Sequence, residues 1–117
     1  MNKRKVGDDY ELMALQYLQE KGILILKKNY RNRFGEIDLI GTDGETLIFF
    51  EVKFRKNLTA GFAEEAVDYK KQHMICRISD FYRVQYRVLD TTPIRYDVIA
   101  INETNIRWIQ NAFPYCF

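Results

Sequence analysis

Acidic residues interrupt two segments of this chain that otherwise have the pattern of buried β-strands. Asp38 lies among apolar residues in the segment 34–40, and Glu51 lies in the segment 46–55. The second segment alternates with period two, so Glu51 and Lys53 share one face of a strand. The pattern therefore predicts that both segments are strands, and that Asp38 and Glu51 lie at positions where apolar residues are expected.

A tight turn between the two segments predicts how they pair. The Asp-Gly dipeptide at residues 43–44 is typical of a two-residue hairpin turn, whose central positions need positive φ. With this dipeptide at the centre of the turn, Asp38 lies opposite Phe49 and on the same face as Glu51. Diagonal neighbours are about 7–8 Å apart at Cβ and directly opposite ones about 4.5–5.5 Å. The carboxylates of Asp38 and Glu51 could therefore converge on one cation, with the ammonium of Lys53 beside them.

The same charges are also compatible with an exposed hairpin. Antiparallel sheets commonly carry polar residues on a solvated face, where Lys53 would neutralise its acidic neighbours. Apolar residues on that face, namely Ile40, Leu47 and Phe49, favour burial instead. Both interpretations stay open on the spacing alone, because awkwardly placed charges mark functional sites only as a tendency.

Length and composition predict one domain over residues 1–117. The chain is 47% hydrophobic and 15% aromatic, which suits a single compact core. It has no run of about 18 apolar residues, and residues 1–7 lack the apolar stretch of a secretory signal. We therefore expect a cytoplasmic protein with no membrane span.

Cys76 and Cys116 are expected to be free thiols, and the single histidine, His73, argues against a multi-histidine metal site.

The distribution of charge is more informative than the net charge of +2. Basic residues flank the acidic segments on both sides: Lys27, Lys28, Arg31 and Arg33 before them, and Lys53, Arg55 and Lys56 after them. Such a frame suits a polyanion such as nucleic acid. It is also what a solvated loop and a charged strand edge that discourages aggregation would carry.

The remaining periodicities predict two helices around a mixed sheet. A first helix is expected from an N-cap at Asp8 or Asp9 to about Glu20, before Gly22. The other expected elements are strands over residues 23–30, the two hairpin segments, 94–101 and 106–110, and a helix over residues 63–84. A strand reached through a crossover helix usually lies parallel to its partner. The order α-β-β-β-α-β-β therefore predicts an α/β fold with a mixed sheet of about five strands flanked by helices.

Glu11 has two interpretations within the first helix. With Asp8 it fits a capping box, and a carboxylate in the first turn complements the helix dipole. It also shares a stripe with Leu15 and Leu18, which turns it toward the sheet. From there a third carboxylate could reach the metal site.

Five motifs in order cover nearly the whole chain: Gly7-x-x-x-Glu11-x-x-Ala14, Gly35-Glu36-Ile37-Asp38-Leu39-Ile40, Phe50-Glu51-Val52-Lys53-x-Arg55, a helix with Lys71, and Arg95-Tyr96-Asp97-Val98. In these motifs the chain resembles the YraN-like uncharacterised proteins. That family is similar to archaeal Holliday junction resolvases and, by resemblance, belongs to the PD-(D/E)XK nuclease superfamily. The resemblance implies a restriction-endonuclease-like fold.

The resemblance also assigns roles to residues. Asp38 and Glu51 match the acidic metal ligands of the superfamily, and Lys53 matches its lysine. Glu11 matches the helix glutamate of the resolvase branch. Ile37 stands where the superfamily often has proline, a departure that is usual in the YraN-like branch and removes no metal chemistry.

The implied function is a metal-dependent nuclease that hydrolyses DNA phosphodiester bonds, with branched DNA as the preferred substrate in repair or recombination. The implied catalytic residues are Glu11, Asp38, Glu51 and Lys53, with Mg²⁺ or Mn²⁺ on Asp38, Glu51 and Glu11. Lys53 would orient the attacking water or stabilise charge in the transition state. Glu36 and Asp97 are second-tier candidates, and the resemblance to resolvases suggests a homodimer.

Two other classes of function stay open. A nucleic-acid-binding module that does not cleave, or a subunit of a DNA-processing assembly, would keep the same fold. The presence of all the acidic and lysine positions weighs against simple loss of activity. A structural or interaction domain would use the late aromatic residues Trp108, Phe113, Tyr115 and Phe117, which more often pack in a core or a dimer than stack on bases.

Overall fold

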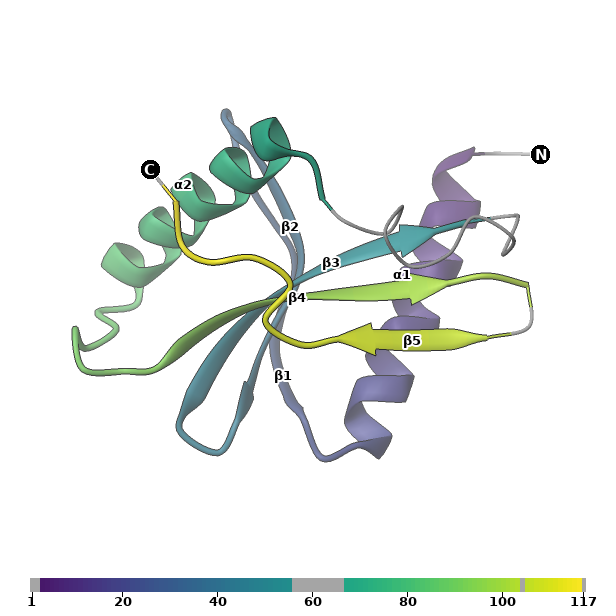
Figure 1. The fold of residues 1–117 in the computed structure, drawn as a ribbon, viewed down its shortest axis with the longest axis horizontal. Helices are drawn as coiled ribbons and strands as arrows, with labels where there is room; N and C mark the ends of the chain where they lie inside the picture. Colours follow the sequence, from purple (N-terminus) through teal and green to yellow (C-terminus); the bar gives the residue numbers. More distant parts are fainter. Residues whose placement is uncertain (1–2, 56–66, 104, 117) are drawn as a thin grey trace.

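The computed structural model of the chain describes residues 3–55, 67–103 and 105–116. The elements in these ranges are α1 (Lys3–Glu20), β1 (Leu24–Asn32), β2 (Gly35–Asp43), β3 (Thr46–Phe54), α2 (Tyr69–Gln85), β4 (Ile94–Ile101) and β5 (Ile106–Ile109). The predicted order α-β-β-β-α-β-β and the mixed five-stranded sheet between two helices are confirmed (Figure 1).

The sheet follows the order of the chain, β1-β2-β3-β4-β5. The pairs β1–β2, β2–β3 and β4–β5 are antiparallel, whereas β3 and β4 are parallel from Leu47–Ile94 to Phe54–Ile101. The parallel pair is the one whose strands are connected through α2, because a crossover returns the chain to the same end of the sheet.

The turn between β2 and β3 differs from the prediction by one residue. Asp43 pairs with Thr46, so Gly44 and Glu45 form the turn rather than Asp43 and Gly44. Of the two central residues only Gly44 has a positive φ, 59°. Glycine in the first central position is the requirement of a type II′ turn, whereas the prediction had assumed type I′.

The corrected turn changes which residues of β2 and β3 lie side by side. Phe50 lies opposite Leu39, and the next residues along the two strands are Glu51 and Asp38. The predicted pairing of Asp38 with Phe49 is therefore wrong. The shift places Asp38 and Glu51 directly after the last backbone pair of the two strands.

Each face of the sheet is covered by one helix. On one face Ala14 and Leu18 of α1 pack in a cluster with the buried strand residues Leu39, Ile48, Phe50, Ile99 and Ile101. On the other face α2 contributes Ile75, Cys76, Ile78 and Tyr82 to a cluster with Ile40, Leu47, Phe49, Tyr96 and Val98. Side chains of β3 and β4 point alternately to the two faces of the sheet, so these strands contribute residues to both clusters.

The predicted helix boundaries were partly correct. The first helix ends at Glu20, and Gly22 follows with φ 90°, as expected of a glycine C-terminal cap. The N-cap predicted at Asp8 or Asp9 is wrong, because α1 already runs from Lys3 and both residues lie inside it. An aspartate inside a helix destabilises it by only about 0.7 kcal/mol relative to alanine, which is too little to set a helix boundary by itself.

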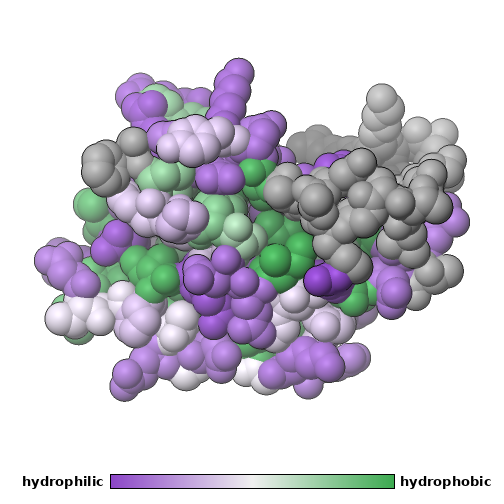
Figure 2. Space-filling model, viewed as in Figure 1, coloured by the Kyte–Doolittle hydropathy of each residue, from purple (hydrophilic) through white to green (hydrophobic). Residues whose placement is uncertain are grey.

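The second helix, α2, begins at Tyr69. Asp68 is its N-cap, with a side-chain oxygen that accepts from the backbone N–H of Lys71 at 2.8 Å. The predicted start at residue 63 lies outside the described residues. Neither helix in the described ranges is long and apolar enough to cross a membrane. On the face drawn in Figure 2, hydrophobic residues show mainly in the middle and hydrophilic ones along the lower rim.

Candidate metal centre

Asp38 lies where β2 and β3 stop pairing. The last backbone pair before it is Leu39–Phe50, and beyond this pair the Asp38 carboxylate accepts a hydrogen bond from the N–H of Val52 at 2.8 Å. A side-chain oxygen thus satisfies a strand N–H at the place where the ladder ends. The hydrogen bond fixes the direction of the Asp38 carboxylate.

Three carboxylates converge at this point. Oxygens of Glu11 on α1 and of Glu36 and Asp38 on β2 all lie within 4.8 Å of one another. Glu11 and its helix neighbours Leu12 and Leu15 also line a hollow of about 300 Å³ beside the cluster. The cluster is therefore partly buried yet reachable from outside.

Negative charge in the cluster is poorly compensated. Burial raises the pKa of Asp38 to about 8, and the carboxylate of Glu51 adds to the rise while the Val52 N–H opposes it. Burial also raises the pKa of Glu11, and the next cause is the charge of Glu36. These shifts are those expected when carboxylates are brought together in a site of low polarity.

Glu51 lies beside the cluster but faces a lysine. Its side chain is 5% exposed, and an oxygen of it lies 2.6 Å from the ammonium of Lys71 on α2. Burial raises the pKa of Glu51, against the influence of Lys71 and of Lys53. Of the predicted site residues, the structure therefore brings Glu11 and Asp38 into one cluster, and holds Glu51 next to it in an ion pair.

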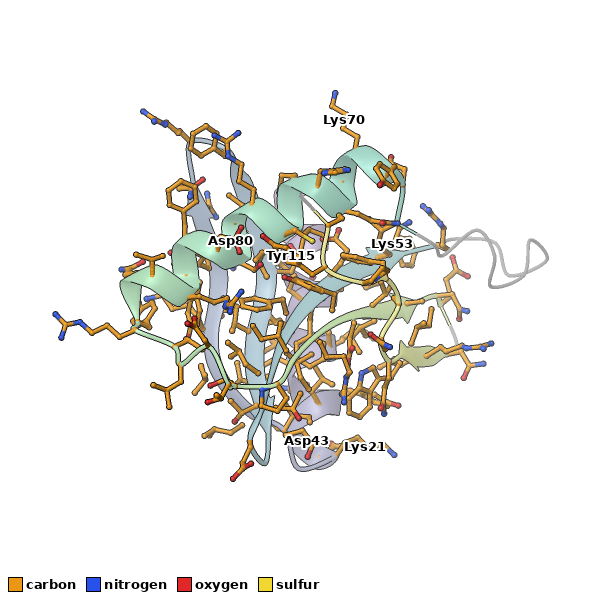
Figure 3. All side chains as sticks on the ribbon, turned by 60° about the vertical axis from the view of Figure 1, so that its left-hand side comes forward. Lys21, Asp43, Lys53, Lys70, Asp80 and Tyr115 are labelled. Carbon is orange, nitrogen blue, oxygen red and sulfur yellow. The ribbon has the colours of Figure 1, made fainter. Side chains whose placement is uncertain are left out.

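The predicted catalytic lysine, Lys53, is half-buried near the end of β3. Its charge acts on Glu51 by lowering that residue's pKa, which places the two near each other. In Figure 3, Lys53 lies at the same end of the molecule as the start of α2, whereas Lys70 extends away from the sheet. Two ammonium groups, those of Lys53 and Lys71, thus border the carboxylates.

Asn29 is a member of the site that the sequence did not indicate. Its neighbours in β1 pair with the residues on either side of Asp38, so Asn29 lies level with Asp38. With its amide nitrogen turned toward the acceptors, it donates to Glu36 at 2.7 Å and to Glu11 at 2.6 Å. Its φ of 53° is in the left-handed region, which asparagine tolerates better than most residues. An asparagine within a strand pattern was the one available clue.

Asp97, a second-tier candidate, does not belong to the cluster. It is fully buried, and its oxygens accept from the Arg95 guanidinium at 2.9–3.1 Å, from the Trp108 indole N–H at 2.8 Å and from the Asn111 N–H at 2.8 Å. With these donors the carboxylate is fully satisfied. Glu36, the other second-tier candidate, is one of the three converging carboxylates.

The donor set suits a hard divalent cation. Mg²⁺ and Mn²⁺ prefer carboxylate and water oxygens, which Glu11, Glu36 and Asp38 supply. The raised pKa of Asp38 is consistent with this fit, because a cation would compensate the same charge that a proton compensates without it. Asn29 could add an amide oxygen by turning its side chain over.

Residues 10–101 of the chain match the uncharacterised protein family UPF0102. The chain belongs to this family. It is 44% identical over 113 residues to a UPF0102 protein of Vibrio parahaemolyticus, covering 95% of this chain and 93% of the relative. A UPF0102 protein of Lachnoclostridium phytofermentans is 42% identical over 113 residues, with coverages of 97% and 96%. One of Clostridioides difficile is 43% identical over 115 residues, with coverages of 97% and 100%.

The match confirms the resemblance to the YraN-like proteins. The part of the chain matched to UPF0102 contains all four residues predicted to be catalytic, Glu11, Asp38, Glu51 and Lys53. It also contains Asn29 and Lys71, which the structure adds to the centre.

Proposed function

We propose that this UPF0102 protein is a metal-dependent nuclease that hydrolyses phosphodiester bonds in DNA. The observation that carries the proposal is the convergence of Glu11, Glu36 and Asp38, whose oxygens lie within 4.8 Å of one another. Clustered carboxylates are electrostatically costly, and a divalent cation removes that cost. The order of the motifs, which resembles that of PD-(D/E)XK nucleases, supports the same reaction.

The roles of the side chains follow from their positions. Glu11, Glu36 and Asp38 would hold Mg²⁺ or Mn²⁺, with Glu51 beside them as a further ligand when it is released from Lys71. When bound, the ion would polarise a phosphate oxygen and lower the pKa of the attacking water. The hydrogen bond from the Val52 N–H would hold the Asp38 carboxylate in one orientation while the ion is bound.

The proposal gives both lysines an electrostatic role. Lys53 and Lys71 place positive charge beside the carboxylates, where negative charge would develop on the phosphate. If Lys53 acts in the transition state, Lys53→Ala abolishes cleavage and leaves DNA affinity within a few-fold, because one ammonium is a small part of a sum over many phosphate contacts. Lys70→Ala is the matched control, since Lys70 extends away from the sheet (Figure 3). Cleavage by Lys53→Ala at the wild-type rate would remove Lys53 from the mechanism.

A cleavage assay with branched and linear DNAs tests the proposal itself. We expect the wild type to cut in Mg²⁺ or Mn²⁺ and not in a chelator, and Asp38→Asn to be slower by about a hundredfold or more. Asp43→Asn is the control, because Asp43 is exposed in the hairpin tip, away from Lys53 in Figure 3. Equal cleavage by the Asp38 and Asp43 variants would contradict the assignment.

A DNA-binding module that does not cleave is the second candidate. The observation in its favour is the 2.6 Å ion pair between Glu51 and Lys71, which engages a carboxylate that the nuclease needs as a ligand. Binding of DNA without cleavage in any metal would establish this alternative. A measurement of DNA binding beside the cleavage assay therefore separates the two functions.

We further propose branched DNA as the substrate and a pair of chains as the working unit, both from the resemblance to resolvases. The sequence shows no recognition-helix motif, so contacts should go mainly to phosphates and affinity should fall steeply with salt. Competition between a four-way junction and unrelated duplexes at fixed ionic strength tests this preference. Selective binding of one linear sequence, with junctions bound no better than random duplex, would contradict it.

A further inference from the structure

A groove runs between the edge strand β1 and the C-terminal half of α2. Its volume is about 770 Å³, and the residues that line it include Lys27, Asn29, Arg31, Arg33, Phe34 and Phe81. Three of these residues are cationic, and none of the lining residues described is acidic. The groove therefore presents an environment for an anion.

Aromatic rings form part of its wall. The rings of Phe34 and Phe81 stack with centroids 5.5 Å apart, and the guanidinium of Arg77 lies 3.6 Å from the Phe34 centroid. Phe81 remains 43% exposed although it lines the groove. An exposed ring beside cations is the combination that binds nucleotides through stacking and phosphate contacts together.

The groove meets the proposed metal centre at two residues. Asn29 lines both the groove and the hollow beside Glu11, and its amide contacts the carboxylates of Glu11 and Glu36. Arg31 lies 3.7 Å from Glu36. A strand whose phosphate lay at the carboxylates could therefore continue directly into the groove.

We propose that this groove binds unpaired nucleotides of the DNA strand that continues from the proposed metal centre. Bases in a duplex are stacked on one another, so Phe81 can stack only on a base whose face is free. Lys27, Arg31 and Arg33 would contact the phosphates of the same nucleotides. The proposal rests on the proposed function, because it takes DNA as the ligand.

Fluorescence anisotropy with a labelled short oligothymidylate and with a blunt duplex, both in Ca²⁺ at low salt, tests the groove. Phe81→Leu should weaken binding of the single strand about tenfold and change duplex binding less than twofold. Tyr115→Leu is the matched control, because Tyr115 is also 43% exposed and does not line the groove. A melting curve of each variant confirms that it is folded.

Charge gives a second readout that does not depend on removing an aromatic ring. Lys27→Gln and Arg33→Gln should each reduce the slope of log affinity against log salt for the single strand by about 0.7, the value for one lost phosphate contact. Lys21→Gln, outside the groove, should leave the slope unchanged. Unchanged slopes for both groove variants, or equal losses for single strand and duplex in Phe81→Leu, would overturn the proposal.

The outcomes also separate the groove from the metal centre. If Phe81→Leu binds the single strand like the wild type while Asp38→Asn abolishes cleavage, the groove assignment fails and the nuclease stands. If no metal supports cleavage but Phe81→Leu still loses single-strand affinity, the nuclease fails and the groove stands. Displacement of the oligothymidylate by polyglutamate as readily as by unlabelled single strand would show an unspecific anion surface and overturn the proposal.

Discussion

Asp38 and Asp97 both interrupt apolar strands of one sheet, yet their surroundings are opposite. Asp97 is fully buried and accepts hydrogen bonds from Arg95, Trp108 and Asn111. Asp38 accepts one backbone hydrogen bond, and burial, followed by the charge of neighbouring carboxylates, raises its pKa to about 8. Burial of an acid therefore does not by itself mark a site. What distinguishes Asp38 is charge that the protein leaves uncompensated.

Substitution of Asp97 is expected to change the free energy of unfolding most. Asp97→Asn should lower the free energy of unfolding by about 3–5 kcal/mol, because it leaves the guanidinium of Arg95 without its carboxylate. Urea unfolding measures the change. The double variant Arg95→Met with Asp97→Asn should recover part of the loss. A loss below about 1 kcal/mol in Asp97→Asn would show that the satisfied carboxylate is not structural.

The next effect is the response to a cation, which should depend on Asp38. Mn²⁺ at a hundred times its dissociation constant should stabilise the wild type by about 2.7 kcal/mol, because it binds only the folded chain. The gain should be small in Asp38→Asn and complete in the control Asp43→Asn. Thermal melting during a Mn²⁺ titration measures it, and equal shifts in wild type and Asp38→Asn would exclude Asp38 as a ligand.

The stability of the metal-free protein should depend on pH through Asp38. The pKa of Asp38 is about 8 in the folded chain and near 3.8 in the unfolded chain, so the folded state binds a proton that the unfolded state has released. Its stabilising contribution is thus complete below pH 4 and is lost as pH rises toward 8. Denaturation in chelator should give a lower free energy of unfolding at pH 8 than at pH 5 in the wild type. In Asp38→Asn the loss should shrink, and an unchanged slope would contradict the assignment.

The smallest effect is expected at the pair between Glu51 and Lys71. Lys71 is 44% exposed, so solvent weakens the interaction, and Lys71→Met should destabilise the protein by only about 1 kcal/mol. Lys70→Met, on the exposed side of α2, should leave stability unchanged. If the two variants unfold at the same urea concentration, the ion pair contributes nothing and Glu51 is effectively free to bind a cation.

The fold could be predicted from the sequence because periodicity and the crossover rule act over short segments. The strand at residues 94–101 was placed correctly, and so was the end of the first helix before Gly22. The errors came where two local solutions have similar energy. Residues 43–45 can form a turn in two registers, and the difference lies in which residue takes the positive φ.

The candidate site could be predicted only in part. Asp38 interrupts an apolar strand pattern, and Glu11 shares a helix stripe with Leu15 and Leu18, so the sequence predicts both as site residues, and the structure brings them together. Asn29 and the pairing of Lys71 with Glu51 depend on a left-handed residue in β1 and on the placement of α2 over β3. Neither leaves a periodic trace in the sequence, so each required the three-dimensional arrangement.

The parallel pairing of β3 with β4 has a consequence for the order of folding. The strands β1, β2 and β3 are joined by short turns, whereas β4 pairs only after the chain from residue 55 to residue 93 has closed. Closing a long connection costs more chain entropy and is slower than forming adjacent hairpins. The converging carboxylates and Asn29 lie between residues 11 and 38, but Lys71 and the last strands come later in the chain. We therefore expect Glu11, Glu36 and Asp38 to come together early in the folding of a nascent chain. A cation could then bind these carboxylates before β4 and β5 have paired.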